Sequence, residues 1–379
     1  MNEFRVGIRS STRKPDERRL PIHPRHFERI DAGIRGRMSV ESGYGERFGI
    51  SDAQLSELVG VVSAEELIAE SDVVVLPKPQ VADLDELRDG QTLWGWPHCV
   101  QDRGITQRAI DKHLTLIAFE AMNHWTSAGG FGLHVFHKNN ELAGYCSVLH
   151  ALELIGSTGD YGRRLSATVI GFGATARGAV TALNAHGIHD VQVLTTRGVA
   201  AVGSPIHSVQ IVQFDHDETA PHLSHVITDR GRLPLAPFLA ESDIIVNCTL
   251  QDTAAPLTYL RTEDLTAFAP GSLIVDVSCD EGMGFSWAKP TTFAEPMITV
   301  GGHVRYYAVD HSPSYLWDSA TWEISEALLP FLPIVAGGPE SWENDETISR
   351  AIEISNGEVR NPAILSFQHR RSEYPYPPL

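Results

Sequence analysis

Three glycines stand where a buried strand would turn into a helix, in residues 166–178 (SATVIGFGATARG). The apolar run 167–170 is typical of a central parallel strand, and Gly171 permits a tight turn that a side chain would block. Gly173 would let the backbone approach a pyrophosphate, whose charge is stabilised by N–H groups at a helix N-terminus. The third glycine of the usual pattern is replaced by Ala176, another small residue. This turn therefore predicts a dinucleotide site, for which we expect the following residues: Gly171, Gly173, Ala174, Thr175 and Ala176.

The next expected strand, 190–194, bears on the choice of nucleotide. Sites for NAD normally have Asp or Glu at the end of this strand, where the carboxylate holds the ribose hydroxyls. Here the strand runs into Thr195, Thr196 and Arg197. Hydroxyls and a guanidinium can receive a 2′-phosphate through charge-assisted hydrogen bonds. Thr196 and Arg197 therefore favour NADP(H) over NAD; the alternative is that Arg197 is a solvated loop residue.

Composition and charge exclude several classes of protein. The 379 residues suffice for two domains, and the net charge of −18 argues against a nucleic-acid partner, which requires a basic face. No run reaches the roughly 18 apolar residues that span a bilayer, and the N-terminus lacks an apolar signal core, so we expect a cytoplasmic protein. The four cysteines have no paired spacing, which predicts neither a metal site nor disulfides.

Strands alternate with helices in two successive parts of the chain, which predicts an α/β protein with parallel sheets. The spacing predicts helices over 25–31 and 52–58, the latter capped by Ser51, and a long connecting helix before the glycine turn. A helical segment at 319–332 would return to the first domain from about residue 301, and residues 370–379 show no pattern. We expect these strands: 4–8, 38–41, 73–76, 92–96 and 114–119, then 167–170, 190–194, 209–214, 243–247, 273–277 and 297–300.

Four residues near expected strand ends or turns carry the chemistry of a substrate site. Arg19 stands just before a proline-bounded turn in 16–24 (DERRLPIHP), where a fixed guanidinium suits a carboxylate. Lys78, between two prolines, and His98 each follow an apolar strand, and ligands gather at the carboxyl ends of parallel strands. A histidine there suits proton transfer. Asp280 follows the strand 273–277. Each residue taken alone also fits an ordinary loop or structural role.

Together these segments resemble the alanine dehydrogenase and pyridine nucleotide transhydrogenase family, which also contains saccharopine dehydrogenases. The likeness is greatest to opine-type members that join an amino acid to a 2-oxo acid. The segments that carry it span some 270 residues in the family's order: 16–24 (DERRLPIHP), 41–52 (ESGYGERFGISD), 90–98 (GQTLWGWPH), 138–152 (KNNELAGYCSVLHAL), 171–178 (GFGATARG), 273–282 (LIVDVSCDEG) and 311–317 (HSPSYLW). Residues 199–239 and the tail after Ser355 have no counterpart in the opine-type pattern.

The resemblance implies two Rossmann-like domains with parallel sheets around a central cleft. A discontinuous catalytic domain would comprise 1–137 and 301–379, and the dinucleotide-binding domain 138–300. Arg19 would bind the substrate carboxylate, Lys78 would bind and polarise the oxo acid, His98 would be the catalytic histidine, and Asp280 would lie beside the nicotinamide. A homo-oligomer acting on a small amino acid and a 2-oxo acid is also implied.

Three functions fit this sequence. The first is an NADPH-dependent condensation of an ornithine- or lysine-like amine with a pyruvate-like oxo acid. The second is an amino acid dehydrogenase that uses ammonia. The third is a regulatory protein that binds a nucleotide without catalysis, which the presence of both Lys78 and His98 disfavours.

Overall fold

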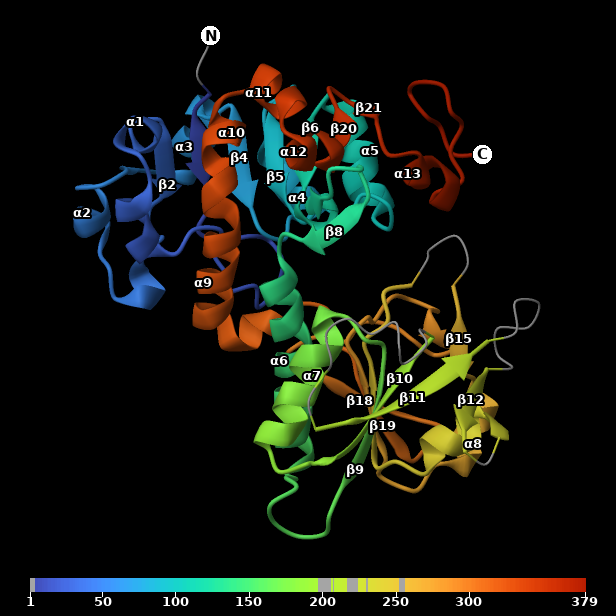
Figure 1. The fold of residues 1–379 in the computed structure, drawn as a ribbon. Coiled ribbons are helices and arrows are strands. Elements are labelled where there is room, and N and C mark those ends of the chain that lie inside the picture. The colour runs from blue at the N-terminus through green and yellow to red at the C-terminus, as the bar shows by residue number, and fades with distance from the viewer. Residues whose placement is uncertain (1–3, 197–205, 207, 217–223, 230, 252–255) are drawn as a thin grey trace. The chain divides into compact units, whose positions relative to one another are not determined.

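The chain forms two compact units, each with its own parallel-rich sheet (Figure 1). The computed structural model describes residues 4–196, 206, 208–216, 224–229, 231–251 and 256–379. The first unit comprises Met1–His137 and Trp317–Leu379, and the second comprises Lys138–Leu316. The expected α/β class with two domains is confirmed.

The first unit is built on an eight-stranded sheet. Its strands, in their order across the sheet, are β21 (Glu358–Val359), β20 (Ile352–Ser355), β6 (Thr115–Ala118), β5 (Thr92–Gly95), β4 (Val73–Leu76), β1 (Val6–Ile8), β2 (Met38–Glu41) and β3 (Gly60–Val62). Strands β1 to β6 are parallel, and β20 joins them antiparallel to β6. The six parallel strands stand in the order 3-2-1-4-5-6, which is the dinucleotide-fold order.

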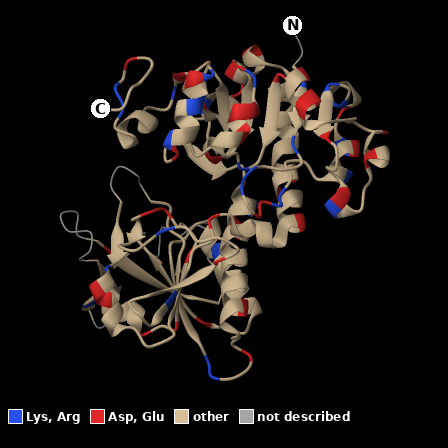
Figure 2. Cartoon of the chain, turned by 180° about the vertical axis from the view of Figure 1, so that it is seen from behind, with Lys and Arg blue, Asp and Glu red and all other residues tan. Residues whose placement is uncertain are grey.

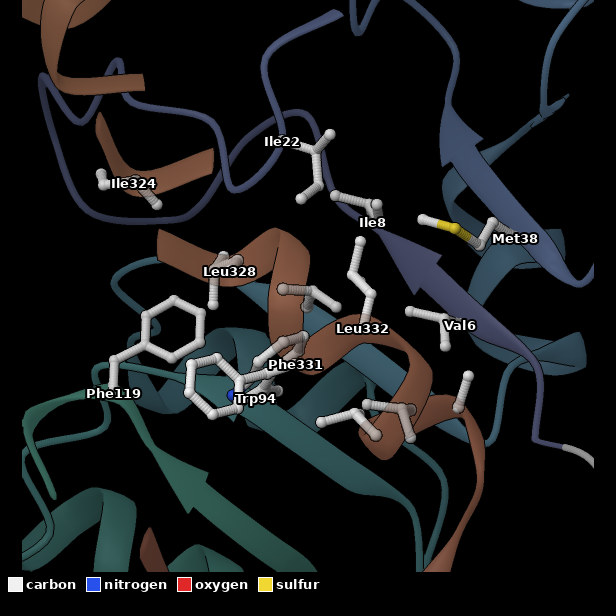
Figure 3. Close-up of a cluster of buried hydrophobic side chains, with 14 of the residues drawn as sticks. Val6, Ile8, Ile22, Met38, Trp94, Phe119, Ile324, Leu328, Phe331 and Leu332 are labelled. Atoms are coloured by element: carbon white, nitrogen blue, oxygen red, sulfur yellow. The ribbon is translucent and has the colours of Figure 1, made fainter. Parts of the chain in front are cut away.

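Helices from both ends of the sequence cover this sheet. They are α1 (Ala32–Arg35), α2 (Asp52–Leu55), α3 (Ala64–Glu70), α4 (Val81–Glu86), α5 (Arg103–Asp111), α9 (Trp317–Leu328), α10 (Leu332–Ala336), α11 (Pro339–Asn344), α12 (Glu346–Ala351) and α13 (Pro362–Phe367). Figure 3 shows Leu328 and Phe331 of the C-terminal segment beside Ile8 and Trp94 of the sheet, in one buried cluster. The core of the first unit is therefore closed by residues more than 200 positions apart in the chain.

Local signals explain several boundaries in this unit. Ser51 caps α2 through a reciprocal capping box with Gln54, as the sequence predicts. The helix expected at 25–31 is instead a 3-10 helix, Pro24–Arg29. The glycine-rich stretch after Trp125 is the turn of a two-stranded hairpin, β7 (Asn123–Trp125) with β8 (Phe131–His134).

The second unit is built on a nine-stranded sheet. Its strands, in spatial order, are β13 (Gly231–Pro234), β12 (His225–Thr228), β11 (Gln210–Asp215), β10 (Asp190–Thr195), β9 (Ser166–Ile170), β14 (Ile244–Asn247), β16 (Leu273–Asp276), β19 (Val304–Tyr307) and β18 (Met297–Val300). The six strands from β11 to β19 are parallel and again follow the order 3-2-1-4-5-6. A second, two-stranded sheet pairs β15 (Thr258–Leu260) with β17 (Gly284–Phe285). The helices are α6 (His137–Ile155), α7 (Ala174–Ala185) and α8 (Leu235–Ala240).

The chain leaves the second unit at Leu316 rather than near residue 301, where the sequence placed the boundary. The reason is β19, which was not expected. It pairs with β16 on one side and with β18 on the other, and Tyr306 and Tyr307 are fully buried there. Removing β19 would leave the edge of β16 and a large apolar surface uncovered.

The formal net charge of the chain is −18. Figure 2 shows Lys and Arg interspersed with Asp and Glu over the helices of the first unit. None of the helices in the described part of the chain has the length and apolar character needed to cross a membrane.

Candidate active site

Three neighbouring parallel strands of the first unit end in titratable side chains. Lys78 follows β4, His98 follows β5 and Glu120 follows β6. Because β4 pairs with β5 and β5 with β6, these residues lie at one edge of the sheet. The Glu120 Oε1 atom accepts a hydrogen bond of 2.6 Å from the His98 backbone N–H and lies 4.0 Å from His98 Nδ1. Lys78 acts electrostatically on the same carboxyl.

Glu120 is the member of this cluster that sequence reasoning missed. Burial raises the pKa of Glu120 to about 8, and the nearby Glu353 carboxylate adds to the rise, while Lys78 opposes it. The Glu120 Oε2 atom is buried and accepts no hydrogen bond from any residue that the structure describes. A carboxyl whose pKa lies near neutrality, beside a lysine and a histidine, is suited to proton transfer.

His98 has an unusual backbone conformation. Its φ of +48° lies in the left-handed region, which a residue with a side chain adopts at a cost. The 2.6 Å bond from its N–H to Glu120 helps to fix this conformation, as do the bonds from Gln101 N–H (3.1 Å) and Asp102 N–H (2.9 Å) to its carbonyl. The imidazole is 42% exposed, so the ring is accessible while its backbone is held.

Arg19 is held in place by two neighbours. Its Nε and Nη2 atoms donate to the two carboxylate oxygens of Glu17, at 2.8 and 2.5 Å, and both side chains are buried. The guanidinium also lies over the Trp96 ring, 5.0 Å from its centre. Trp96 directly follows β5, the strand that His98 also follows, so this contact places the Arg19 guanidinium near the carboxyl end of β5. Glu17 fixes the plane of the fork, as recognition of a planar carboxylate requires.

In the second unit the glycine turn is as the sequence predicts. Gly171 has φ +112°, and a Cβ at this position would lie 3.0 Å from the Cys248 carbonyl oxygen, so only glycine fits. Gly173 is the N-cap of α7 and makes no side-chain capping bond. A Cβ at Gly173 would meet no atom of the described residues within 4 Å. The backbone at the N-terminus of this 12-residue helix is therefore not crowded by the described part of the chain, as the predicted approach of a pyrophosphate requires.

The other residues predicted to contact the nucleotide fall in the first residues of α7 and in the sequence just after β10. Ala174 and Thr175 form the first turn of α7, and Ala176 is fully buried in the core. Thr196 is exposed just after β10, whereas Arg197 lies outside the described residues. Gly178 serves packing rather than nucleotide binding, because a Cβ there would lie 1.7 Å from the Glu141 carbonyl oxygen of α6.

Asp280 is half-buried in the turn after β16, and a buried carboxylate anchors this turn. Asp276 accepts hydrogen bonds from Asn247 Nδ2 (2.9 Å), the Cys279 N–H (3.1 Å) and the Tyr306 hydroxyl (2.8 Å). Cys279 itself has φ +42°. Burial raises the pKa of Asp276 to about 6, against the effect of these three bonds. The carboxylate thus ties β14, β16 and β19 to the turn that carries Asp280.

A pocket of about 700 Å³ in the first unit contains none of the predicted residues. It lies beside Arg9, whose guanidinium is paired with Glu41 at 2.9 Å and with Glu86 at 3.0 Å. Arg9, Arg13 and Arg88 line it together with Glu41, Glu65 and Glu86, so the charges of its lining balance. The cluster around Glu120 combines a lysine, a histidine and a carboxyl with a raised pKa, and it is therefore the better candidate for proton transfer.

Both domains have the dinucleotide-fold strand order. One carries a glycine turn and the other carries titratable groups at its strand ends, a combination typical of oxidoreductases that use a dinucleotide. The family models for the N-terminal and C-terminal domains of alanine dehydrogenase/PNT match residues 7–142 and 164–362. The chain belongs to the alanine dehydrogenase/pyridine nucleotide transhydrogenase family. Members of this family are oxidoreductases that use NAD(H) or NADP(H).

Similar proteins include two enzymes at modest identity. An alanine dehydrogenase of Halomonas elongata is 26% identical over 86% of each chain. An N(5)-(carboxyethyl)ornithine synthase of Clostridium botulinum is 25% identical over 83% of this chain and 89% of its own. A solved L-alanine dehydrogenase superposes with a TM-score of 0.75 at 20% identity, covering 96% of this chain and 98% of its own. A transhydrogenase of Sinorhizobium meliloti gives a TM-score of 0.68, over 94% and 99% of the two chains, at 20% identity. These two structural likenesses concern the fold.

Proposed function

We propose that the protein is an NADPH-dependent oxidoreductase that joins the amine of an ornithine- or lysine-like amino acid to a pyruvate-like 2-oxo acid, giving an N-(carboxyalkyl) amino acid. The observation that carries the proposal is the cluster of Lys78, His98 and Glu120 at one sheet edge, with the buried guanidinium of Arg19 over the ring of Trp96, which directly follows β5. Such a set offers a cation for a carboxylate, a cation for an oxo group and two groups that move protons.

The chemistry gives each side chain a task. The amine nitrogen forms a bond to the oxo carbon, the resulting hydroxyl leaves as water after taking up a proton, and an imine remains. In this scheme Arg19 binds the oxo acid's carboxylate and Lys78 polarises its oxo oxygen. His98 and Glu120 take the proton from the attacking ammonium and deliver one to the leaving hydroxyl. A carboxyl with a pKa of about 8 can hold that proton near neutral pH and also release it.

The nucleotide is proposed to bind at the turn of the second unit, through the backbone of Gly171, Gly173 and the first turn of α7. When bound, it supplies the hydride that reduces the imine to a secondary amine. Thr196 and Arg197 are proposed to receive the 2′-phosphate, which favours NADPH. Asp280 is proposed to act beside the nicotinamide, held by the buried Asp276 carboxylate.

A second candidate keeps the site and replaces the amino acid amine with ammonia. Alanine dehydrogenases outnumber the ornithine-condensing enzyme among the relatives, which favours this alternative. The Thr195-Thr196-Arg197 strand end opposes it, since an acidic residue is expected there in an NAD enzyme.

Product mass separates the two candidates. The purified protein would be incubated with pyruvate and, in turn, ornithine, lysine or ammonia, with NADPH or NADH, and the products identified by mass spectrometry. We expect nucleotide oxidation with ornithine or lysine, a secondary amine of the condensed mass, and a preference for NADPH. Alanine formed only with ammonia would establish the dehydrogenase instead. Neither product, over a wider set of amines and oxo acids, would refute both.

A further inference from the structure

The C-terminal segment after α13 contacts the turn that carries His98. Gln368 is almost fully buried, and its Nε2 atom donates to the carbonyl oxygens of Cys99 at 2.7 Å and Val100 at 3.3 Å, the two residues directly after His98. The same atom lies 3.1 Å from the Thr106 hydroxyl of α5, which itself donates to the Cys99 carbonyl at 2.7 Å. One side chain from the end of the sequence therefore binds both carbonyls of this turn.

Arg370 fixes the orientation of that amide. Its Nε atom donates to Gln368 Oε1 at 2.7 Å, so the amide oxygen faces the guanidinium and the NH2 group faces the turn. Nη1 of the same arginine donates to Gln107 Oε1 at 2.8 Å and to the Tyr376 carbonyl at 3.1 Å. Gln368 and Arg370, hereafter the C-terminal clamp, thus link the end of the chain to α5 and to the His98 turn.

The turn needs such support because of its backbone. A left-handed φ at a residue with a side chain is strained and persists only where the surroundings enforce it. His98 has φ +48°, and its N–H and carbonyl are both hydrogen-bonded. The clamp adds a further constraint, because Gln368 binds the carbonyls of the two residues that follow His98. The imidazole is therefore attached to a turn whose backbone is held by hydrogen bonds.

We propose that Gln368 is a positioning residue for His98, with Arg370 orienting its amide. The inference rests on the proposed function for the role of His98 in turnover. The family model for the C-terminal domain matches as far as residue 362, so the clamp lies beyond the matched residues. It assigns a role to Arg370, within the stretch 370–379, in which the sequence shows no pattern.

A second buried glutamine of the same unit provides a matched control. Gln91 precedes β5, and its Nε2 atom donates to the carbonyl oxygens of Ile68 at 2.9 Å and Ser71 at 2.7 Å. Its Oε1 atom accepts from the Arg88 N–H at 2.8 Å. Gln368→Met and Gln91→Met therefore each remove a buried amide that donates to two carbonyls, one beside His98 and one at the opposite end of the same strand. At the second position the Arg88 side chain still donates to the Ile68 and Ser71 carbonyls, at 3.1 and 2.6 Å, so this variant tests the loss of a buried amide away from the site.

The test measures hydrogen exchange and turnover in both variants. In Gln368→Met we expect the amides of residues 98–102 to exchange at least about tenfold faster, because the turn loses two hydrogen bonds. We also expect kcat to fall by about tenfold with KM nearly unchanged, because the imidazole is less well positioned; a tenfold fall corresponds to about 1.4 kcal/mol. In Gln91→Met we expect neither change.

Three outcomes are decisive. Unchanged exchange at 98–102 in Gln368→Met would overturn the clamp, whether or not a substrate has been found. Faster exchange with wild-type kcat would overturn the positioning role. Equal losses of kcat in the two glutamine variants would reduce Gln368 to a stabilising residue. Absence of turnover in the wild-type protein would instead refute the proposed function, and the exchange measurement would still decide the clamp.

Discussion

The Glu120 carboxyl holds a proton through much of the neutral pH range, because burial raises its pKa to about 8. Its sheet-edge neighbours are a lysine and a histidine, and its Oε1 atom also holds the His98 backbone. The same group therefore fixes the conformation of the turn and offers a proton at the place where the substrate is proposed to react. These two tasks can be separated by replacing the carboxyl with an amide, which still accepts through Oε1 but does not titrate.

Glu120→Gln is expected to lower kcat by at least about 100-fold, the usual scale for loss of a proton-transfer group. Its effect on stability has a definite sign. An acid whose pKa is raised on folding binds a proton that the unfolded chain releases above about pH 4.5, so the wild type loses stability as pH rises from about 4.5 to 8. The amide removes this loss. Urea midpoints at pH 5 and pH 8.5 should therefore differ less in the variant.

The exposed Glu340→Gln provides the control for this experiment, since its substitution should leave both the midpoints and kcat as they are in the wild type. If Glu120→Gln kept full turnover, or if its midpoints changed with pH as much as those of the wild type, Glu120 would not be a titrating member of the site.

At the scale of elements, Asp276 joins the central strands of the second unit to the turn bearing Asp280. Its three hydrogen-bond partners are all donors: an amide of β14, the Cys279 N–H and the Tyr306 hydroxyl of β19. Asp276→Asn would replace one acceptor oxygen with an NH2 group, so the Tyr306 hydroxyl would have to accept instead of donating. We expect a loss of about 1–3 kcal/mol in unfolding free energy and a fall in kcat, measured by denaturation and initial rates.

Tyr306→Phe is the matched comparison, because it removes one of the three donors and leaves the carboxylate in place. Its expected cost is about 1 kcal/mol, below that of Asp276→Asn. An Asp276→Asn protein as stable and active as the wild type would show that the carboxylate does not anchor the turn.

Central strands with apolar runs, such as Val73–Leu76 and Leu273–Asp276, were predicted from the sequence and are buried on both faces. Alternating strands such as Met38–Glu41 and Gln210–Asp215 were predicted as well. The missed strand β20 reads IEIS, a short alternating pattern that depends on β6 for its place in the sheet. Glu120 was missed for a similar reason, because the residues next to it in the sequence form no motif that indicates a functional site. The available signal was its position after an expected strand, the same signal that identified Lys78 and His98.

At the scale of the whole molecule, the two proposed tasks belong to different units with separate cores. The residues of the first unit's main core and those around the glycine turn form distinct buried clusters. Nucleotide binding and proton transfer should therefore be separable by substitutions that leave each core intact. Gly173 is the better position for such a substitution than Gly171. Gly171 has φ +112° and a crowded Cβ position, so replacing it would strain the fold as well as the site.

Gly173→Leu is expected to abolish nucleotide binding without loss of stability. Gly173 has φ −85°, which any residue adopts, and a Cβ there would meet no atom of the described residues within 4 Å, so we expect the leucine to fill the space in which a pyrophosphate is proposed to lie. Titration of NADPH fluorescence should show at least about 100-fold weaker binding, and the thermal midpoint should stay within a degree or two of the wild type.

His98→Ala should show the reverse, with wild-type nucleotide affinity and turnover reduced by at least about 100-fold. Normal NADPH affinity in Gly173→Leu would refute the nucleotide site. Full function in His98→Ala, combined with its loss in Gly173→Leu, would identify a protein that binds the nucleotide without catalysing its oxidation.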